Sequence, residues 1–221
     1  MKARSAKRGV GCMSLIALCM GAGFAGCTGS LFQSKATPLS TYRLSANLGT
    51  AQAGVPPAVI AADLAVQRPR VRTGLDTDRI AALYPDRRLD YFADARWSGP
   101  LDQVIQDLVV QAFDSGAHLR NVSTEASAFL SGYWLEIRVA DFQAEYTSAG
   151  LAPTVYVHLL ARLGTARDRH LLGTFDASSR QTASDNRLAA IVDAYERAAD
   201  AALAEIVANT SRMLKDDSEH P

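Results

Sequence analysis

Cysteine is scarce in this sequence, with Cys12, Cys19 and Cys27 as the only three in 221 residues. Cys12 and Cys19 fall inside an N-terminal segment that has the layout of a cleavable signal peptide, so Cys27 would be the single cysteine of the mature chain. One thiol cannot build an internal disulfide framework, even in an exported protein. The folded part of the chain must therefore be stabilised by its apolar core.

Three motifs of nucleotide, metal and acyl-substrate sites are also lacking. The chain has no P-loop, no GxSxG and no HExxH sequence. Its four histidines stand at positions 118, 158, 170 and 220. His158 and His170 fall in consecutive predicted strands and are expected to be cross-strand neighbours, but without a third ligand an ordinary half-exposed pair is favoured over a metal site. The sequence predicts no catalytic residue, no metal and no cofactor.

Neither an excess of one charge nor a long apolar run is present. The formal net charge is 0, and removal of the four cations among residues 1–26 makes it −4, which argues against nucleic acid as a partner. The apolar stretch from Val10 to Ala25 is shorter than the roughly 20 residues that span a bilayer and is rich in glycine. We therefore favour a signal peptide over an uncleaved transmembrane anchor.

Cys27 closes this segment in a sequence that resembles a lipobox, Phe24-Ala25-Gly26-Cys27. Small residues at the two positions before the cysteine let the lipoprotein signal peptidase cut there, although leucine is commoner where Phe24 stands. A diacylglyceryl group and an N-acyl chain on Cys27 would give stable membrane attachment, because each buried methylene contributes about 0.8 kcal/mol and one chain alone holds only marginally. We predict a signal peptide at 1–26, a tether at 27–39, a domain at 40–213 and a flexible tail at 214–221.

Period-two alternation of apolar residues predicts most of the remaining elements as strands. Short strands are expected at residues 41–44, 59–66, 80–84, 88–97 and 119–122. In the fourth of these, one face is expected to carry Leu89, Tyr91, Ala93, Ala95 and Trp97. Three longer runs, at 133–146, 155–163 and 169–177, predict an antiparallel meander. The apolar phase slips by one residue in the first long run, which predicts a bulge near Ala140 or Asp141.

Two helices are predicted from apolar residues at helical spacing. The first spans 101–113, with Ser98 as the expected cap of its start and Gly116 as a left-handed cap of its end. The second spans 185–213, with a cap at Ser184 or Asp185, and is long enough to cross a whole sheet. Together these elements predict a single α+β domain. It has a mixed, mainly antiparallel sheet with two helices on one face and a long C-terminal helix.

The runs Gly74-Leu75-Asp76-Thr77-Asp78-Arg79-Ile80 and Arg88-Leu89-Asp90-Tyr91-Phe92-Ala93-Asp94-Ala95-Arg96-Trp97 resemble the ABC-type transport auxiliary lipoproteins, the PqiC/YmbA-like family. The resemblance extends from about Tyr42 to the last helix. It implies an anchor in the inner leaflet of the Gram-negative outer membrane and association with an MCE-type lipid transport system. It implies no catalytic residue. Thr28, where an aspartate would favour retention in the inner membrane, agrees with the outer membrane.

Charged residues gather in the same block, and we predict that they form a partner interface. These residues are Asp76, Asp78, Arg79, Asp90, Asp94 and Arg96. Interleaved arginines favour a salt-bridged surface over a paired-carboxylate catalytic site. A second group, Arg68, Arg70 and Arg72, could touch anionic lipid head groups, but a solvated strand edge is the favoured interpretation.

The sequence thus favours a non-enzymatic auxiliary lipoprotein that docks an MCE-domain subunit at the outer membrane. Two alternatives remain open. A direct lipid-binding carrier in the periplasm would need an apolar cavity, and an envelope hydrolase would need the aspartates to converge in a pocket. A homo-oligomer is compatible with a multimeric partner.

Overall fold

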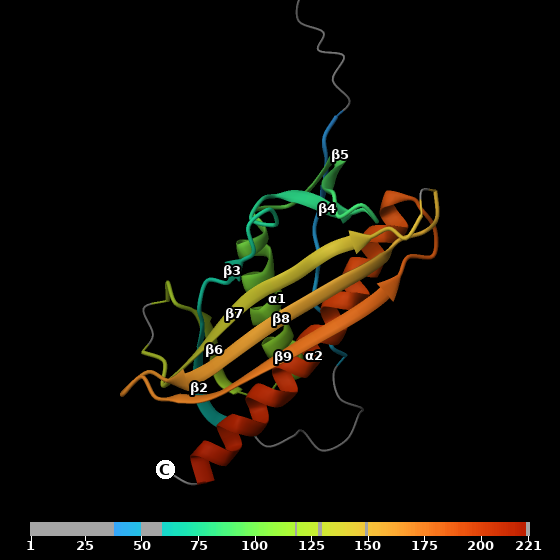
Figure 1. Cartoon of the computed structure of the whole chain (residues 1–221). Coiled ribbons are helices and arrows are strands. Elements are labelled where there is room, and N and C mark those ends of the chain that lie inside the picture. The colour runs from blue at the N-terminus through green and yellow to red at the C-terminus, as the bar shows by residue number, and fades with distance from the viewer. Residues whose placement is uncertain (1–37, 50–58, 118, 128–129, 149, 220–221) are drawn as a thin grey trace, which may run out of the picture. The chain divides into compact units, whose positions relative to one another are not determined.

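A computed structural model describes residues 38–49, 59–117, 119–127, 130–148 and 150–219. The predicted signal peptide, Cys27 and most of the predicted tether lie outside these ranges. Within them the chain forms nine strands and two helices (Figure 1). In chain order they are β1 (Ser40–Tyr42), β2 (Ile60–Val66), β3 (Arg70–Val71), β4 (Arg79–Leu83), β5 (Leu89–Trp97), α1 (Leu101–Gly116), β6 (Leu119–Thr124), β7 (Tyr133–Glu145), β8 (Thr154–Thr165), β9 (Leu171–Thr182) and α2 (Leu188–Glu219).

Strand β7 organises the sheet because both of its edges are paired along most of its length. One edge pairs antiparallel with β8, which pairs antiparallel with β9. The other edge pairs in parallel with three short strands in succession. Residues 133–135 pair with β2, residues 138–139 with β3 and residues 144–145 with β4. The sheet is mixed, its long pairings are the predicted antiparallel meander, and the predicted α+β class is confirmed.

The predicted bulge in β7 is confirmed at Ala140. Val139 pairs with Leu159 and Asp141 pairs with His158, so Ala140 has no partner of its own on β8. The extra residue restores the phase of the strand. As a result Val139 and Phe142 both point into the core, at 0% and 1% exposure, although they are three positions apart.

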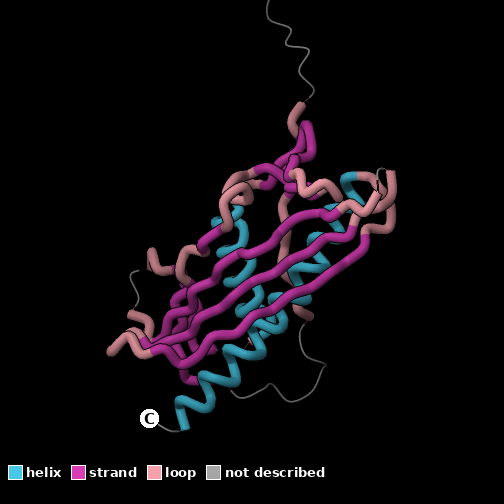
Figure 2. Tube along the Cα trace, viewed as in Figure 1, coloured by secondary structure: helices cyan, strands magenta, loops and turns pink. Residues whose placement is uncertain are grey.

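Both helices cover the same face of the sheet, and Figure 2 shows them behind the long strands. Helix α2 packs on β8 and β9, and α1 packs on β6, β2 and β3. Between the layers Tyr195 contacts Trp97 edge to face, with ring centroids 5.1 Å apart. Its hydroxyl donates to the carbonyl oxygen of Ala81 at 2.7 Å. Complete burial raises the pKa of Tyr195 well above its usual value, so the phenol remains a donor at neutral pH.

The predicted caps of α1 are wrong at both ends. Pro100, rather than Ser98, is the N-cap, and no side chain bonds to the first turn from the cap. At the other end Gly116 is the last helical residue, and the C-cap is Ala117 in an extended conformation. The glycine has a packing role instead, because a Cβ at Gly116 would come within 2.9 Å of Cδ1 of Leu48.

Helix α2 extends beyond its predicted end. It continues from Leu188 to Glu219, about 48 Å at 1.5 Å per residue, so residues 214–219 of the predicted tail are helical. Leu214 is fully buried, and Asp217 accepts a hydrogen bond from Tyr133 at 2.8 Å. No helix in the described ranges combines the length and apolarity needed to cross a membrane.

The strict alternation predicted for β5 is also wrong. Ala81 pairs with Tyr91 whereas Arg79 pairs with Arg96, so β5 contains three more residues than β4 between these pairs. The chain bulges there, and Asp94 adopts a φ of 54°. Ala95 and Trp97 are buried as expected, but Ala93 is exposed and Leu89 is 37% exposed. A bulge resets the phase, so the five residues do not share one buried face.

Candidate functional site

The charged residues predicted as a partner interface lie on and beside β4 and β5, but each has its own environment. Asp78 pairs with Arg96 at 3.8 Å, and Asp90 pairs with Arg88 at 3.4 Å. The guanidinium of Arg79 stacks on the ring of Tyr91 at 4.3 Å.

The two remaining aspartates of this set are exposed. Asp76 lies in the turn that precedes β4, and Asp94 lies in the bulge of β5. Asp78 and Asp90 are thus held by two different arginines. The arrangement is a salt-bridged surface.

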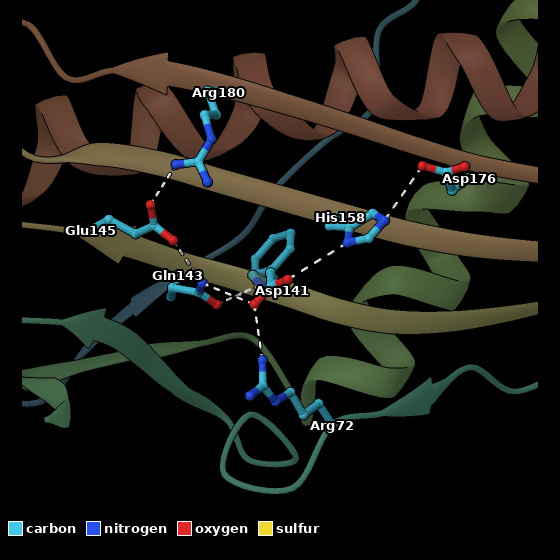
Figure 3. A network of polar contacts seen from close by, with 8 residues as sticks. Arg72, Asp141, Gln143, Glu145, His158, Asp176 and Arg180 are labelled. Carbon is cyan, nitrogen blue, oxygen red and sulfur yellow. Dashed lines mark hydrogen bonds and ion pairs between the residues drawn. The ribbon is translucent and has the colours of Figure 1, made fainter. Parts of the chain in front are cut away.

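A second polar site, which the sequence did not reveal, occupies the face of the meander opposite the helices (Figure 3). Asp141 on β7 is at its centre. Its carboxylate accepts a hydrogen bond from Arg72 at 3.1 Å and lies 3.6 Å from Nδ1 of His158. The other ring nitrogen of His158, Nε2, lies 3.6 Å from Asp176 on β9. The chain of contacts therefore crosses β7, β8 and β9.

Gln143 links this chain to a second one on the same face. Its side-chain nitrogen donates to Asp141 and to Glu145, both at 3.1 Å, while its oxygen accepts from the backbone N–H of Phe142 at 3.0 Å. Glu145 in turn accepts from Arg180 at 2.5 Å. That hydrogen bond raises the pKa of Arg180, and the guanidinium also stacks on Tyr156 at 3.7 Å. Gln143 is only 4% exposed, so it fixes both acidic side chains from below.

The arginines at 68, 70 and 72 take part in the same kind of pairing. Arg70 lies 3.0 Å from Glu136, and Arg68 pairs with Asp102 at the start of α1. Each of the three arginines thus has an acidic partner on another element. The three arginines are exposed, as expected of a solvated strand edge, and each also forms an ion pair.

The network is a set of hydrogen bonds and ion pairs that joins neighbouring strands on the polar face of the sheet. Asp141 and Asp176 contact different nitrogens of His158, so the three side chains do not converge on one point. Over the described ranges no three His, Cys, Asp or Glu side chains are grouped to hold a metal ion. The predicted pairing of His158 with His170 is wrong, because His158 lies opposite Ser178 and His170 lies in the turn opposite Thr165.

The phase of β7 explains why this network was missed. Asp141 is placed opposite His158 only after Ala140 is counted as an extra residue. The shift in apolar spacing placed the bulge at either Ala140 or Asp141. The residue opposite His158 differs between these two positions of the bulge. His158 on the polar side of an alternating strand was the one signal that could have drawn attention to this face.

The main clefts on the described surface have mixed polar and apolar linings. One of about 650 Å³ lies at the end of β7, lined by residues that include Gln67, Glu125, Trp134 and Arg169. A smaller one of about 180 Å³ lies beside the network. Between the sheet and the helices, by contrast, the apolar side chains form one packed cluster. A third cleft of about 640 Å³ lies between Leu48 and α2, and small and apolar residues such as Ala204, Val207 and Ala208 line much of it. A direct lipid carrier therefore stays an open alternative.

The comparisons with known proteins point to one family and one fold. The model of the ABC-type transport auxiliary lipoprotein component family matches residues 42–207. The crystal structure of protein XCC0632 from Xanthomonas campestris is similar, with a TM-score of 0.71 and 23% identity over 81% of this chain and 99% of that one. The crystal structure of an uncharacterized protein is similar at a TM-score of 0.59 and 16% identity, over 80% of this chain and 98% of that one. Among curated proteins there is no match.

Proposed function

Because this chain belongs to the ABC-type transport auxiliary lipoprotein component family, we propose that it is a non-enzymatic subunit that docks an MCE-type lipid transporter at the outer membrane. The family match over residues 42–207 carries this proposal. The folded domain agrees with a docking role, since its polar face carries an ion-pair network and most of its large apolar residues form one core. Energy for transport would come from another subunit.

Lipid on Cys27 would hold the domain at the membrane. The cysteine follows Ala25 and Gly26, and only a dozen residues separate it from β1. A tether of that length keeps the domain within a few nanometres of the bilayer, because an extended chain spans at most about 3.5 Å per residue. The protein would therefore act where it is anchored, and a partner that spans the periplasm would be brought to it.

The block around β4 and β5 is the partner surface we favour. Its exposed aspartates, Asp76 and Asp94, alternate with Arg79, Arg88 and Arg96. Charges at the rim of an interface steer association and set its orientation more than they set its affinity. This surface fits a partner that presents the complementary pattern.

The test is purification of the native protein from envelope, with mass spectrometry of the N-terminal peptide and of co-purifying proteins. We expect Cys27 to carry a diacylglyceryl and an N-acyl group and an MCE-domain protein to be recovered. Replacement of Cys27 by serine should release the protein from the membrane and abolish recovery, while Thr28→Ser serves as the matched control. An unmodified Cys27, or the absence of any MCE-domain protein from the lipidated sample, would contradict the proposal.

A further inference from the structure

Among the described residues, strand β9 ends the sheet and its outer edge pairs with no other strand. It is 12 residues long, pairs with β8, and contains neither proline nor lysine. Figure 1 shows it as the outermost of the long strands, with α2 against one of its faces. Long edges of this kind present free backbone donors and acceptors, and proteins usually block them with charge, proline or a bulge.

The register of β9 shows which backbone groups face outward. The N–H of Ala183 donates to the carbonyl oxygen of Pro153, which places the odd-numbered residues of β9 in the hydrogen-bonded pairs with β8. The N–H and C=O groups of the even-numbered residues from 174 to 182 therefore point away from β8. Their side chains all lie on the polar face, and they are Thr174, Asp176, Ser178, Arg180 and Thr182.

Residues at equal distances on either side of Ser178 are either identical or opposite in charge. Thr174 and Thr182 lie four positions to either side of it, and Asp176 and Arg180 lie two positions to either side. We propose that β9 pairs antiparallel with β9 of a second copy of this chain, about a two-fold axis at Ser178. Each Asp176 then lies opposite Arg180 of the second copy, and the two sheets become continuous across the axis.

Asp176 and Arg180 are both exposed, and Arg180, which already bonds Glu145 and stacks on Tyr156, would reach the second copy with its remaining donors. Asp176 is 69% exposed and reaches His158 only at 3.6 Å, too far for a hydrogen bond. Arg180 is 54% exposed, and its bond to Glu145 uses one of five guanidinium donors. On the helix side of the strand the central positions are the small Ala177 and Ser179, which let the two edges approach.

Arg197 on α2 limits the length of the pairing. Its guanidinium donates to the carbonyl oxygen of Thr182 at 3.3 Å, which occupies that acceptor at the end of the edge. The outward backbone groups that are left for pairing are therefore those of residues 174–180, which include Ser178. The proposal concerns copies of this chain only and holds whether or not the transport partner of the preceding section is correct.

A disulfide trap in intact membranes tests the geometry. In a hydrogen-bonded antiparallel pair the two Cα atoms at the axis are about 5.5 Å apart, within disulfide range. Ser178→Cys in the full-length protein should give a covalent dimer on mild oxidation. Thr174→Cys is the matched control on the same face, since its two copies would be roughly 26 Å apart at 3.3 Å per residue. Equal dimer yields from the two variants, or no dimer from S178C, would overturn the proposal.

Charge exchange provides a second test that needs no cysteine. Asp176→Arg would place two arginines opposite each other, so the dimer fraction measured by light scattering of the detergent-solubilised protein should fall several-fold. Adding Arg180→Asp restores opposite charges across the axis, and the double variant should recover most of the dimer. If the double variant is as monomeric as D176R, the pairing is not the one proposed. A monomeric wild-type protein would also refute it.

Discussion

Gly164 lies opposite Trp134 near the end of β8, in the hairpin that joins β8 to β9. A Cβ at this position would come within 2.3 Å of the Trp134 ring and 2.5 Å of the backbone oxygen of His170. The ring cannot move freely, because its N–H donates to the carbonyl oxygen of Thr165 at 2.9 Å. The backbone contact cannot relax through a side-chain rotation either. Gly164 is therefore required for close packing.

We expect Gly164→Ala to lower the free energy of unfolding by about 1–3 kcal/mol, the usual cost of overpacking. Gly132→Ala is the control, since a Cβ at Gly132 meets nothing within 4 Å. Urea denaturation followed by circular dichroism would measure both. Near-equal stability of the two variants would show that the hairpin can adjust around Trp134.

Single residues also mark where sequence reasoning was sound and where it was not. The alternation in β8 was read correctly, and Val155, Val157 and Leu159 are at most 1% exposed. It succeeds because a strand buried on one face constrains every second residue. Ser98 and Gly116 failed as caps because propensity describes what a residue can do. At Gly116 the space is set instead by Leu48, a residue far away in the sequence.

Among the elements, α2 depends on its last two turns more than the sequence indicated. Leu214 is fully buried, and Asp217 holds the hydroxyl of Tyr133. The high charge of residues 215–219 suggested a tail, but charged residues on the exposed side of a helix are compatible with burial of the other side.

We expect truncation after Met213 to destabilise the domain by about 2–3 kcal/mol, chiefly through loss of the buried Leu214 side chain. Truncation after Glu219, which removes only residues 220 and 221, should leave the free energy of unfolding unchanged. Thermal or urea unfolding of the two truncated proteins would measure the difference. If both unfold like the full chain, the last turns of α2 do not contribute to the core.

The bulge at Ala140 affects both faces of β7. The apolar slip was visible in the sequence, and it kept both Val139 and Phe142 in the core. On the other face the same slip places Asp141 opposite His158 and lines up the ion-pair network. The burial of Val139 and Phe142 could be predicted, because the spacing of apolar residues indicates which positions face the core. The pairing of Asp141 with His158 could not, because charged residues on an exposed face follow no such spacing.

For the whole molecule, the sequence predicted the α+β class and the layer order, whereas the parallel pairings of β2, β3 and β4 along one edge of β7 required the structure. Those pairings join segments separated by long stretches of chain, so no local pattern encodes them. They also set the distance between the polar network and the charged block on β4 and β5. The partner interface proposed on that block remains a prediction from the sequence.

Neutralising its exposed charges tests that interface. Asp76→Asn with Asp94→Asn should reduce co-purification of the MCE-domain protein several-fold at low salt, since each exposed charge pair contributes about 0.2–1 kcal/mol. Asparagine tolerates the φ of 54° at position 94, so the fold should be unaffected. Asp193→Asn with Glu205→Gln, at exposed positions of α2, removes the same charge elsewhere and should leave recovery unchanged. An equal loss with both pairs would indicate a dependence on net charge alone, and no loss with either would place the partner on another surface.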